Sequence, residues 1–328
     1  MAHTSLVVGL QFPGAHSTLA PAGPQSSLVM AGLWAPMYAI AAVTFALVVG
    51  ALVWALLRRR TAGDVLDDPA RARRMGWTVG IATALTAAVL FVCLVLDISV
   101  GRAVAAAPGN PAVRIRVTGH QWWWEVQYLD SLPQLQATTA NEIHVPVGRP
   151  VVVELRSADV IHSFWPPNLV GKRDLIPGEV NSLRFQVDRA GVYRGQCAEY
   201  CGQQHAKMAF TVVAEPADRF AEWLAAQRDG AAAPADSLAR RGLEVFLGSS
   251  CVLCHTIAGT PAGGRAGPDL THLASRRTIA AGTRPNIRGN LAGWIVDPQA
   301  LKPGARMPPN DLSPADLRAL VAYLETLR

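Results

Sequence analysis

Two long apolar segments dominate the first third of the chain. Residues 28–57 and 75–96 contain no Lys, Arg, Asp or Glu, and each exceeds the roughly 20 residues that a helix needs to cross the hydrocarbon core of a bilayer. A buried helix of a soluble protein rarely stays free of charge over such a length. The pattern therefore predicts a transmembrane helical hairpin over residues 28–99.

The arginines between these two segments predict the orientation of the hairpin. The connection contains Arg58, Arg59, Arg60, Arg71, Arg73 and Arg74. Short loops rich in Lys and Arg stay in the cytoplasm. We therefore expect a two-pass protein of a bacterial plasma membrane, with both termini and everything after about residue 100 on the periplasmic or outer face.

The hydrophobic pattern changes after the second apolar segment. Short segments rich in β-branched and aromatic residues recur there, separated by turn residues such as Gly148 and Pro150. Short strands at this spacing are typical of a β-sandwich or a Greek-key barrel. The candidate strands are residues 113–117, 122–128, 142–146, 151–156, 182–187, 192–197 and 208–213.

The C-terminal part of the chain returns to helical patterns. The last helix has a strong start signal, since Ser313 can cap it, Pro314 fits its first turn and Asp316 follows the cap by three residues. An apolar face then runs along Leu317, Leu320, Val321, Leu324 and Leu327.

These patterns divide the chain into five parts. Residues 1–27 lack the positive region of a signal peptide and are predicted to be a flexible tail, and an Ala/Gly/Pro-rich linker is predicted further along. The full division is a tail at 1–27, a transmembrane hairpin at 28–99, an all-β domain at 108–228, a linker at 229–236 and an all-α domain at 237–328.

Composition and charge narrow the class of protein. Half of the residues are hydrophobic and only 16% are charged, which fits a membrane protein with soluble domains and argues against a disordered or nucleic-acid-binding chain. The net charge of +6 is uneven. Residues 237–328 carry 11 basic and 6 acidic residues, a net of +5. This charge either steers acidic partners to the domain or forms an ordinary solvated surface.

A first group of candidate metal ligands lies at the end of the all-β domain. Two thiols, an imidazole and a thioether fall within residues 197–208, and a further histidine lies upstream. Soft sulfur together with imidazole suits copper. Two cysteines could bridge two ions, with one histidine on each ion and two weak axial ligands. The candidates are His162, Cys197, the carbonyl oxygen of Glu199, Cys201, His205 and Met208.

Two other interpretations of these residues remain open on chemistry alone. A structural zinc site could use Cys197, Cys201, His205 and His162 in tetrahedral geometry, although it would leave Met208 without a role. A disulfide between the two cysteines is also compatible with an oxidising compartment. Cys93, inside the second apolar segment, is expected to be a packing residue.

A family resemblance favours copper. The stretches VIHSFWPPNLVGKRDLIPG at 160–178 and GQCAEYCGQQHAKM at 195–208 closely resemble subunit II of cytochrome c oxidase, and the likeness covers roughly residues 28–228. The resemblance implies a cupredoxin-like fold that holds a dinuclear CuA centre. All six ligand positions of that family are filled by the residues named above.

The resemblance also suggests roles for three further positions. Trp122, in the segment 119–124, falls on the family position for electron entry. The carboxylate of Glu199 falls on a position that helps to bind magnesium at the boundary with subunit I, although a single carboxylate is a weak magnesium site. Arg74 stands where the family often has a glutamate near a proton channel, so the resemblance implies no proton path through this position.

A second cofactor motif stands in the all-α domain. Cys251, Cys254 and His255 form a C-x-x-C-H sequence, the attachment signature of c-type haem, with His255 as an iron ligand. Met307 is the candidate sixth ligand, because thioether ligation suits an electron carrier of high potential. His272 is the alternative.

The surrounding residues resemble class I cytochromes c. The resemblance rests on Gly242 and Phe246 in the first helix, on residues 267–270 after the haem motif, and on Tyr323 in the last helix. It implies that the carbonyl oxygen of Pro268 accepts the Nδ1–H of His255.

Together these observations predict an electron-transfer subunit of a haem–copper respiratory oxidase. Electrons would pass from an external donor, either cytochrome c or a quinol–cytochrome c reductase, through haem c and CuA to subunit I. Subunit III is a further expected partner, and nucleic acid is not. The alternatives are a CuA-containing nitric oxide reductase subunit and a membrane-anchored copper-delivery protein. The intact ligand set argues against a quinol oxidase subunit, and a fused haem argues against delivery.

Overall fold

The computed structural model describes residues 16–58, 69–105, 113–132 and 135–328. These residues form two compact units. One is a helical hairpin, and the other combines the segment before the hairpin with the soluble domains after it.

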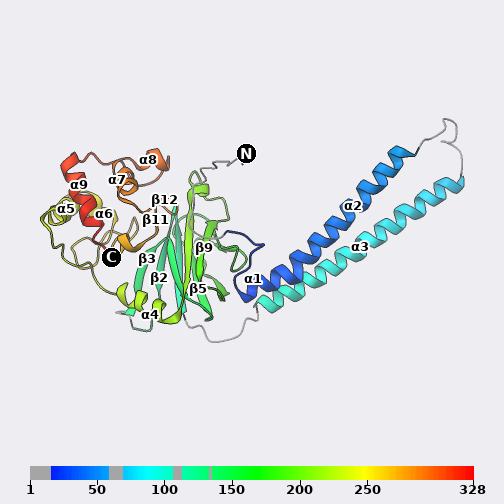
Figure 1. Ribbon diagram of the computed structural model, residues 1–328, viewed down its shortest axis with the longest axis horizontal. Helices are drawn as coiled ribbons and strands as arrows, with labels where there is room; N and C mark the ends of the chain where they lie inside the picture. The colour runs from blue at the N-terminus through cyan, green and yellow to red at the C-terminus, as the bar shows by residue number, and fades with distance from the viewer. Residues whose placement is uncertain (1–15, 59–68, 106–112, 133–134) are drawn as a thin grey trace, which may run out of the picture. The chain divides into compact units, whose positions relative to one another are not determined.

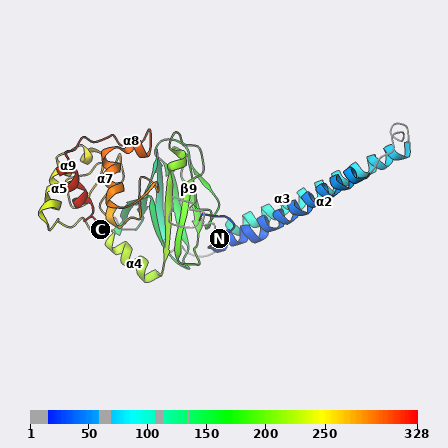
Figure 2. The ribbon, with the colours of Figure 1, turned by 45° about the horizontal axis from the view of Figure 1, so that its top comes forward.

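The hairpin consists of two long helices that run side by side in opposite directions (Figures 1 and 2). A short helix α1 (Pro24–Val29) and a π-helical turn (Met30–Trp34) lead into α2 (Ala35–Leu57), and α3 (Pro69–Ala105) returns. The helical stretches Pro24–Leu57 and Ala72–Ala105 are long and apolar enough to cross a membrane. The predicted two-helix hairpin is thus confirmed, and α3 continues past the charge-free segment to include Asp97 and Arg102.

The all-β domain is a sandwich of two five-stranded sheets with strand orders β3-β2-β1-β5-β8 and β4-β10-β9-β6-β7. Each sheet contains one parallel pair, β1 with β5 and β10 with β4, among antiparallel neighbours. The strands are β1 (Val113–His120), β2 (Trp123–Tyr128), β3 (Ala137–Ala140), β4 (Glu142–Pro146), β5 (Val151–Ser157), β6 (His162–Trp165), β7 (Arg173–Leu175), β8 (Asn181–Phe185), β9 (Gly191–Cys197) and β10 (Ala209–Glu215).

An aromatic cluster fills the sandwich beside the candidate copper ligands. Trp124 packs edge-on against Phe210 at 5.4 Å between ring centroids, and Phe164 stacks on Phe210 at 4.3 Å. Close packing continues beneath this ring, because a Cβ on Gly195 would lie 2.1 Å from Phe210. The cluster therefore fixes β6, which carries the candidate ligand His162, and β9 and β10, which flank the loop with the other candidate ligands.

Part of the predicted N-terminal tail is bound to the sandwich. The amide of Ala22 donates to the Asn168 carbonyl at 2.8 Å, and the Asn168 side chain donates to Ala20 O at 2.8 Å. The Gln25 side chain accepts the Gln186 amide at 3.1 Å. Residues 16–26 thus pair their polar groups with the sandwich, a long-range contact that tail-like composition does not reveal; residues 1–15 lie outside the described part.

The all-α domain is built around two crossing helices, α5 (Ser237–Leu247) and α9 (Pro314–Leu324). Gly242 allows the crossing, since a Cβ there would lie 2.0 Å from the Ala319 carbonyl oxygen. The predicted cap of α9 is present, with Ser313 Oγ accepting the Asp316 amide at 3.1 Å. The same domain contains α6 (Cys251–Cys254), α7 (Arg288–Val296), α8 (Pro298–Leu301) and a two-stranded sheet of β11 (Thr278–Ile279) and β12 (Arg284–Pro285), whereas α4 (Ala217–Ala226) packs on the sandwich through Phe220 and Trp223.

The predicted linker lies against the all-α domain. The Ala231 amide donates to Ala258 O at 2.8 Å, and His272 Nε2 lies 3.1 Å from Asp229 O. Asp236 caps α5 by accepting the Ala239 amide. Three separate hydrogen bonds therefore hold the connection between the two soluble domains.

A buried histidine in the middle of β4 lies between two carboxylates. His144 Nδ1 lies 2.7 Å from Glu215, its Nε2 lies 3.0 Å from Glu142, and its ring stacks on Trp223 at 4.0 Å. Glu142 also accepts the Arg277 amide of the all-α domain at 3.0 Å. Burial alone would lower the pKa of His144, but the two carboxylates raise it above its ordinary value.

The raised pKa of His144 predicts a pH-dependent stability. A group with a raised folded-state pKa stabilises the fold fully below its unfolded pKa of about 6.5 and loses that contribution as the pH rises through the folded value. Stability of the soluble unit in the full chain should fall as the pH rises above about 6.5. His144→Ala should cost about 3–5 kcal/mol, because it removes the imidazole partner of the buried Glu142 and of the half-buried Glu215, and should remove this slope.

Denaturant unfolding followed by tryptophan fluorescence at several pH values would measure both effects. His120→Ala is the matched control, since His120 belongs to the same sandwich and stacks on Trp123. An unchanged pH slope in His144→Ala would contradict the assignment.

Candidate copper and haem centres

Strand pairing brings the candidate copper ligands together. His162 opens β6 and Cys197 closes β9, and these strands are antiparallel neighbours with Phe164 opposite Cys197. Cys201 and His205 follow in the loop between β9 and β10, and Met208 directly precedes β10. Residues separated by 35 positions in sequence therefore meet at one end of the sandwich.

The donor atoms converge. The two thiol sulfurs of Cys197 and Cys201 are 3.8 Å apart. Cys197 Sγ lies 3.9 Å from His162 Nδ1, and Cys201 Sγ lies 3.6 Å from His205 Nδ1. The remaining two donors are the Met208 thioether, 3.8 Å from Cys201 Sγ, and the Glu199 carbonyl oxygen, 3.3 Å from Cys197 Sγ.

The chemistry of this donor set fits a soft cation. Both cysteines are free thiols, so a disulfide is not what joins them. Pairing with Cys201 lowers the pKa of Cys197, whereas the same pairing raises the pKa of Cys201, because two adjacent thiolates repel. A bound cation would allow both to ionise. Met208 is fully buried within this set, which favours copper over a zinc site that would leave the thioether unused.

A carboxylate that sequence reasoning missed orients the first histidine. Asp159 Oδ1 lies 2.8 Å from His162 Nε2, which leaves Nδ1 for the metal side. Burial alone would raise the pKa of Asp159, but hydrogen bonds from His162 and from the amides of Gln121 and Val160 lower it to about 2. The signal was a carboxylate three residues before a candidate ligand.

Two side chains hold the backbone of Cys201. Gln121 Nε2 and Trp122 Nε1 donate to its carbonyl oxygen at 2.8 and 3.0 Å. Trp122 is half-buried, whereas Trp124 is a fully buried core residue. Trp122 thus contacts a candidate ligand directly, and Gln121 is a second contact that the sequence did not suggest.

The Glu199 side chain behaves differently from its backbone. Its carboxylate is partly exposed and lies 3.4 Å from Lys172 Nζ. The Glu199 carbonyl oxygen faces the thiols. Glu199 thus adds its backbone oxygen to the candidate donor set, while its side chain lies at the surface.

The haem motif lies at the turn after α5. Cys251 and Cys254 are the ends of α6, and His255 follows with its Nδ1 2.7 Å from the Pro268 carbonyl oxygen. Burial, with a further contribution from Arg276, lowers the pKa of His255 and favours the neutral imidazole that ligates iron. A Cβ on Gly267 would lie 2.6 Å from His255 Cε1. Free thiols, a fixed imidazole and this tight cradle fit covalently bound haem.

The two candidate sixth ligands have different surroundings. His272 is buried, and its Nε2 lies within hydrogen-bond distance of Asp229 O in the linker. Met307 is half-buried on a loop whose backbone is held by Gln299, which donates to Met307 O at 3.1 Å. His272 Nε2 thus has a structural role, whereas its buried Nδ1 has no hydrogen-bond partner among the described residues, so both side chains remain candidate ligands.

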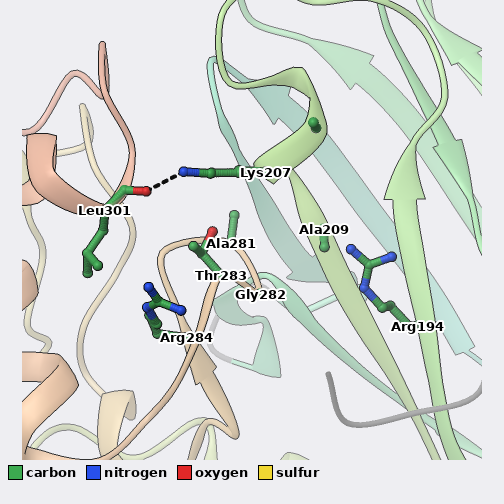
Figure 3. Close-up of a pocket in the computed structure, with 9 residues that line it drawn as sticks. Arg194, Lys207, Ala209, Ala281, Gly282, Thr283, Arg284 and Leu301 are labelled. Carbon is green, nitrogen blue, oxygen red and sulfur yellow. Dashed lines mark hydrogen bonds between the residues drawn. The ribbon is translucent and has the colours of Figure 1, made fainter. Parts of the chain in front are cut away.

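The two soluble domains meet along a polar seam. It is formed by Gln204 and Lys207 of the loop between β9 and β10, which we call the copper loop, and by Leu301, Lys302 and Pro303 of the all-α domain. Lys207 Nζ donates to Leu301 O at 2.6 Å (Figure 3). A pocket of about 220 Å³ lies beside this bond, and Figure 3 shows the side chains around it. Sequence reasoning did not predict this contact.

Comparisons with known proteins match both soluble domains. Residues 133–215 match the family described as cytochrome c oxidase subunit II, periplasmic domain, and residues 239–328 match the cytochrome c family. Cytochrome c oxidase subunit 2 of Alkalihalophilus pseudofirmus is 35% identical over 95% of this chain and 91% of that protein. The Bacillus subtilis protein of the same name is 31% identical over 66% of this chain and 63% of its own length.

Solved structures are also similar over part of the chain. The periplasmic domain of subunit II of cytochrome oxidase from Bradyrhizobium japonicum is 30% identical, with a TM-score of 0.35. The similarity covers 37% of this chain and 96% of that domain.

The close approach of Gly119 to His162 generates a prediction. A Cβ at Gly119 would lie 2.7 Å from His162 Cδ2, so Gly119→Ala must displace the ring. Copper affinity should fall about ten- to hundredfold, as it does when ligand orientation is lost. Metal analysis of the full chain against a competing chelator would measure this. Gly289→Ala, in α7 with open space around the new Cβ, is the control; equal copper affinity in both variants would refute the prediction.

The position of Met307 generates a second prediction. Met307→Ala should abolish the absorption band that reports methionine ligation of haem and lower the haem potential, since a thioether ligand raises it. His272→Ala should retain that band. A spectrum that changes only in the His272 variant would assign the ligand to His272 instead.

Proposed function

The chain belongs to the cytochrome c oxidase subunit 2 family, and on that basis we propose which of its residues form the copper and haem centres and how electrons pass between them. The chain is an electron-transfer subunit of cytochrome c oxidase with a fused cytochrome c domain. Its donor cluster and its cytochrome c domain imply copper and haem c.

The observation that carries the proposal is the convergence of six donors at one end of the sandwich. Four of them are buried: His162, Cys197, Cys201 and Met208. Cys197, Cys201, His162 and His205 would hold the copper, together with Met208 and the Glu199 carbonyl oxygen. Copper held by these donors would supply one-electron transfer at a potential that the ligands and the hydrogen bonds around them set.

The protein's part in this chemistry is to keep the donors still. His162 is held by Asp159, and the Cys201 backbone by Gln121 and Trp122. The stacked rings of Phe164 and Phe210 fix the strands behind the site. Donor positions that are fixed in advance need little rearrangement when an electron arrives or leaves.

In the cytochrome domain, Cys251 and Cys254 would form the thioether links, and His255 and Met307 would ligate the iron. Haem c supplies a second one-electron centre. The Pro268 carbonyl sets the tautomer of His255 by accepting Nδ1–H, so that Nε2 remains for iron.

The seam supports an internal route for electrons. Lys302 of the cytochrome domain contacts the carbonyl of Trp122, whose indole contacts Cys201. We therefore assign Trp122 to transfer between the two domains. The external donor, cytochrome c or a quinol–cytochrome c reductase, would dock on the basic cytochrome domain, where a net charge of +5 attracts an acidic surface.

The hairpin would anchor this subunit beside subunit I, and subunit III would be a further neighbour. The arginines at 58–60, 71, 73 and 74 would keep the loop in the cytoplasm, with the cofactor domains on the periplasmic or outer face of a bacterial plasma membrane. A magnesium ion shared with subunit I would take one ligand from the Glu199 carboxylate, and it would have to displace Lys172 from that carboxylate.

Cys201→Ser tests the proposed copper site. The variant removes one bridging thiolate, so the mixed-valence copper signal in electron paramagnetic resonance should disappear while the haem spectrum persists. Reduction of the haem should no longer be followed by reduction of copper. Leu253→Ser, at an exposed position within the haem motif, is the control for altered polarity near a cofactor. An intact mixed-valence signal in Cys201→Ser would exclude the proposed ligand set.

A further inference from the structure

One buried charge of the cytochrome domain is not explained by haem binding. Lys302 is 3% exposed, and its ammonium donates to Trp122 O at 3.1 Å and to Ala280 O at 3.4 Å. A buried ammonium is costly unless it is well paired. The two carbonyls belong to different domains, so this side chain joins them.

The seam around Lys302 is tightly packed. Pro303 O accepts a hydrogen bond from Gln204 of the copper loop. Gly304 has a φ of 85° and lies so close to the same loop that a Cβ there would be 2.1 Å from Gln203 Oε1. Residues 302–304 thus combine the buried ammonium of Lys302, the carbonyl of Pro303 and the close approach of Gly304 in one tight contact between the two domains.

A second contact lies on the same loop. Arg306 donates to Gln121 Oε1 and lies 3.8 Å from Asp159 Oδ2. Both partners touch copper ligands, since Gln121 holds the Cys201 backbone and Asp159 holds His162. Arg306 is mostly exposed, however, with 63% of its side chain accessible, and exposed ion pairs contribute little. The buried Lys302 is therefore the stronger link.

Lys302 also adds a positive charge near the thiols. Burial, together with Lys207, lowers the pKa of this ammonium to about 7, while the charge of Cys201 opposes that shift. Lys302 contacts the carbonyl of Trp122, and the indole of Trp122 donates to the Cys201 carbonyl, so a positive charge on Lys302 lies beside the thiol cluster and stabilises negative charge there. A cation near a metal centre favours the reduced state, which carries one more electron.

We propose that Lys302 is the positioning residue for electron transfer between the two centres: it fixes the Met307-bearing loop on Trp122 and raises the potential of the copper centre. This inference rests on the proposed function. The step moves one electron, oxidising the haem iron and reducing the copper pair, with no proton transferred and no covalent bond made or broken.

Two substitutions separate the two effects of Lys302. Lys302→Met removes both charge and hydrogen bonds at similar volume. It leaves the Trp122 carbonyl without a donor, whereas Ala280 O keeps its hydrogen bond from Thr283 Oγ1 at 2.7 Å. Lys302→Gln keeps a donor but removes the charge. Arg318→Met, at an exposed position in α9 of the same domain, is the control for loss of one positive charge.

Three measurements on the full chain loaded with copper and haem test the proposal. The first is the rate of copper reduction after rapid photoreduction of the haem. The second is the copper midpoint potential. The third is amide hydrogen exchange at Ala209, whose N–H donates across the seam to Ala281 O at 3.1 Å.

In Lys302→Met, transfer should slow and Ala209 exchange should quicken, each on the order of tenfold, because the unpaired Trp122 carbonyl disfavours the docked arrangement. The copper potential should fall. In Lys302→Gln the potential should fall similarly, with a smaller effect on exchange. Arg318→Met should match the unmodified chain in all three measurements.

The inference would be overturned if Lys302→Met had the same rate of copper reduction and the same copper midpoint potential as the unmodified chain. The same holds if Arg318→Met lowers the potential as much as Lys302→Met does. Failure of the proposed function would look different, because the unmodified chain would then lack the mixed-valence copper signal or show no transfer from haem to copper.

Discussion

Two cysteine sulfurs lie 3.8 Å apart at the end of a β-sandwich, where they are almost fully shielded from water. The rest of the structure depends on this pair. Two thiolates so close repel each other, and burial strengthens the repulsion. A bound cation removes the conflict. The sandwich therefore has to supply the remaining ligands and also the rigidity that keeps the pair from separating when no metal compensates it.

The sandwich meets that demand through strand pairing and a layer of supporting contacts. Pairing of β6 with β9 sets His162 beside Cys197, and the aromatic cluster behind them resists displacement. Asp159, Gln121 and Trp122 then fix one imidazole and one backbone carbonyl. The same three residues contact Lys302 and Arg306 of the cytochrome domain. The residues that hold the candidate copper ligands therefore also form the surface on which the cytochrome domain docks. One set of contacts thus serves ligand orientation and domain assembly.

The sequence predicted the features that depend on local pattern or on fixed spacing. Charge-free segments revealed the hairpin, the C-x-x-C-H motif indicated the candidate haem site, and the spacing from Cys197 to Met208 indicated most of the candidate copper donors. It could not predict contacts made by tertiary packing. Asp159 and Gln121 are ordinary polar residues until β1 and β6 bring them to the ligands.

Tertiary packing also decides the structure of the domain ends and of the contacts between domains, which the sequence therefore did not predict. The composition of residues 16–26 is that of a flexible segment, yet Asn168 and Gln186 bind them to the sandwich. Lys302 is charged and would be expected at the surface, but the seam buries it. Neither placement follows from the local sequence, because each depends on a partner more than 100 residues away.

The central claim is that the paired cysteines hold copper and that the haem domain passes electrons to this copper. The most direct test is metal analysis of the purified full chain together with haem quantification. The account predicts two copper ions and one covalently bound haem for each chain. One zinc ion in place of copper, or a chain that carries haem but binds no copper when the metal is supplied, would contradict it.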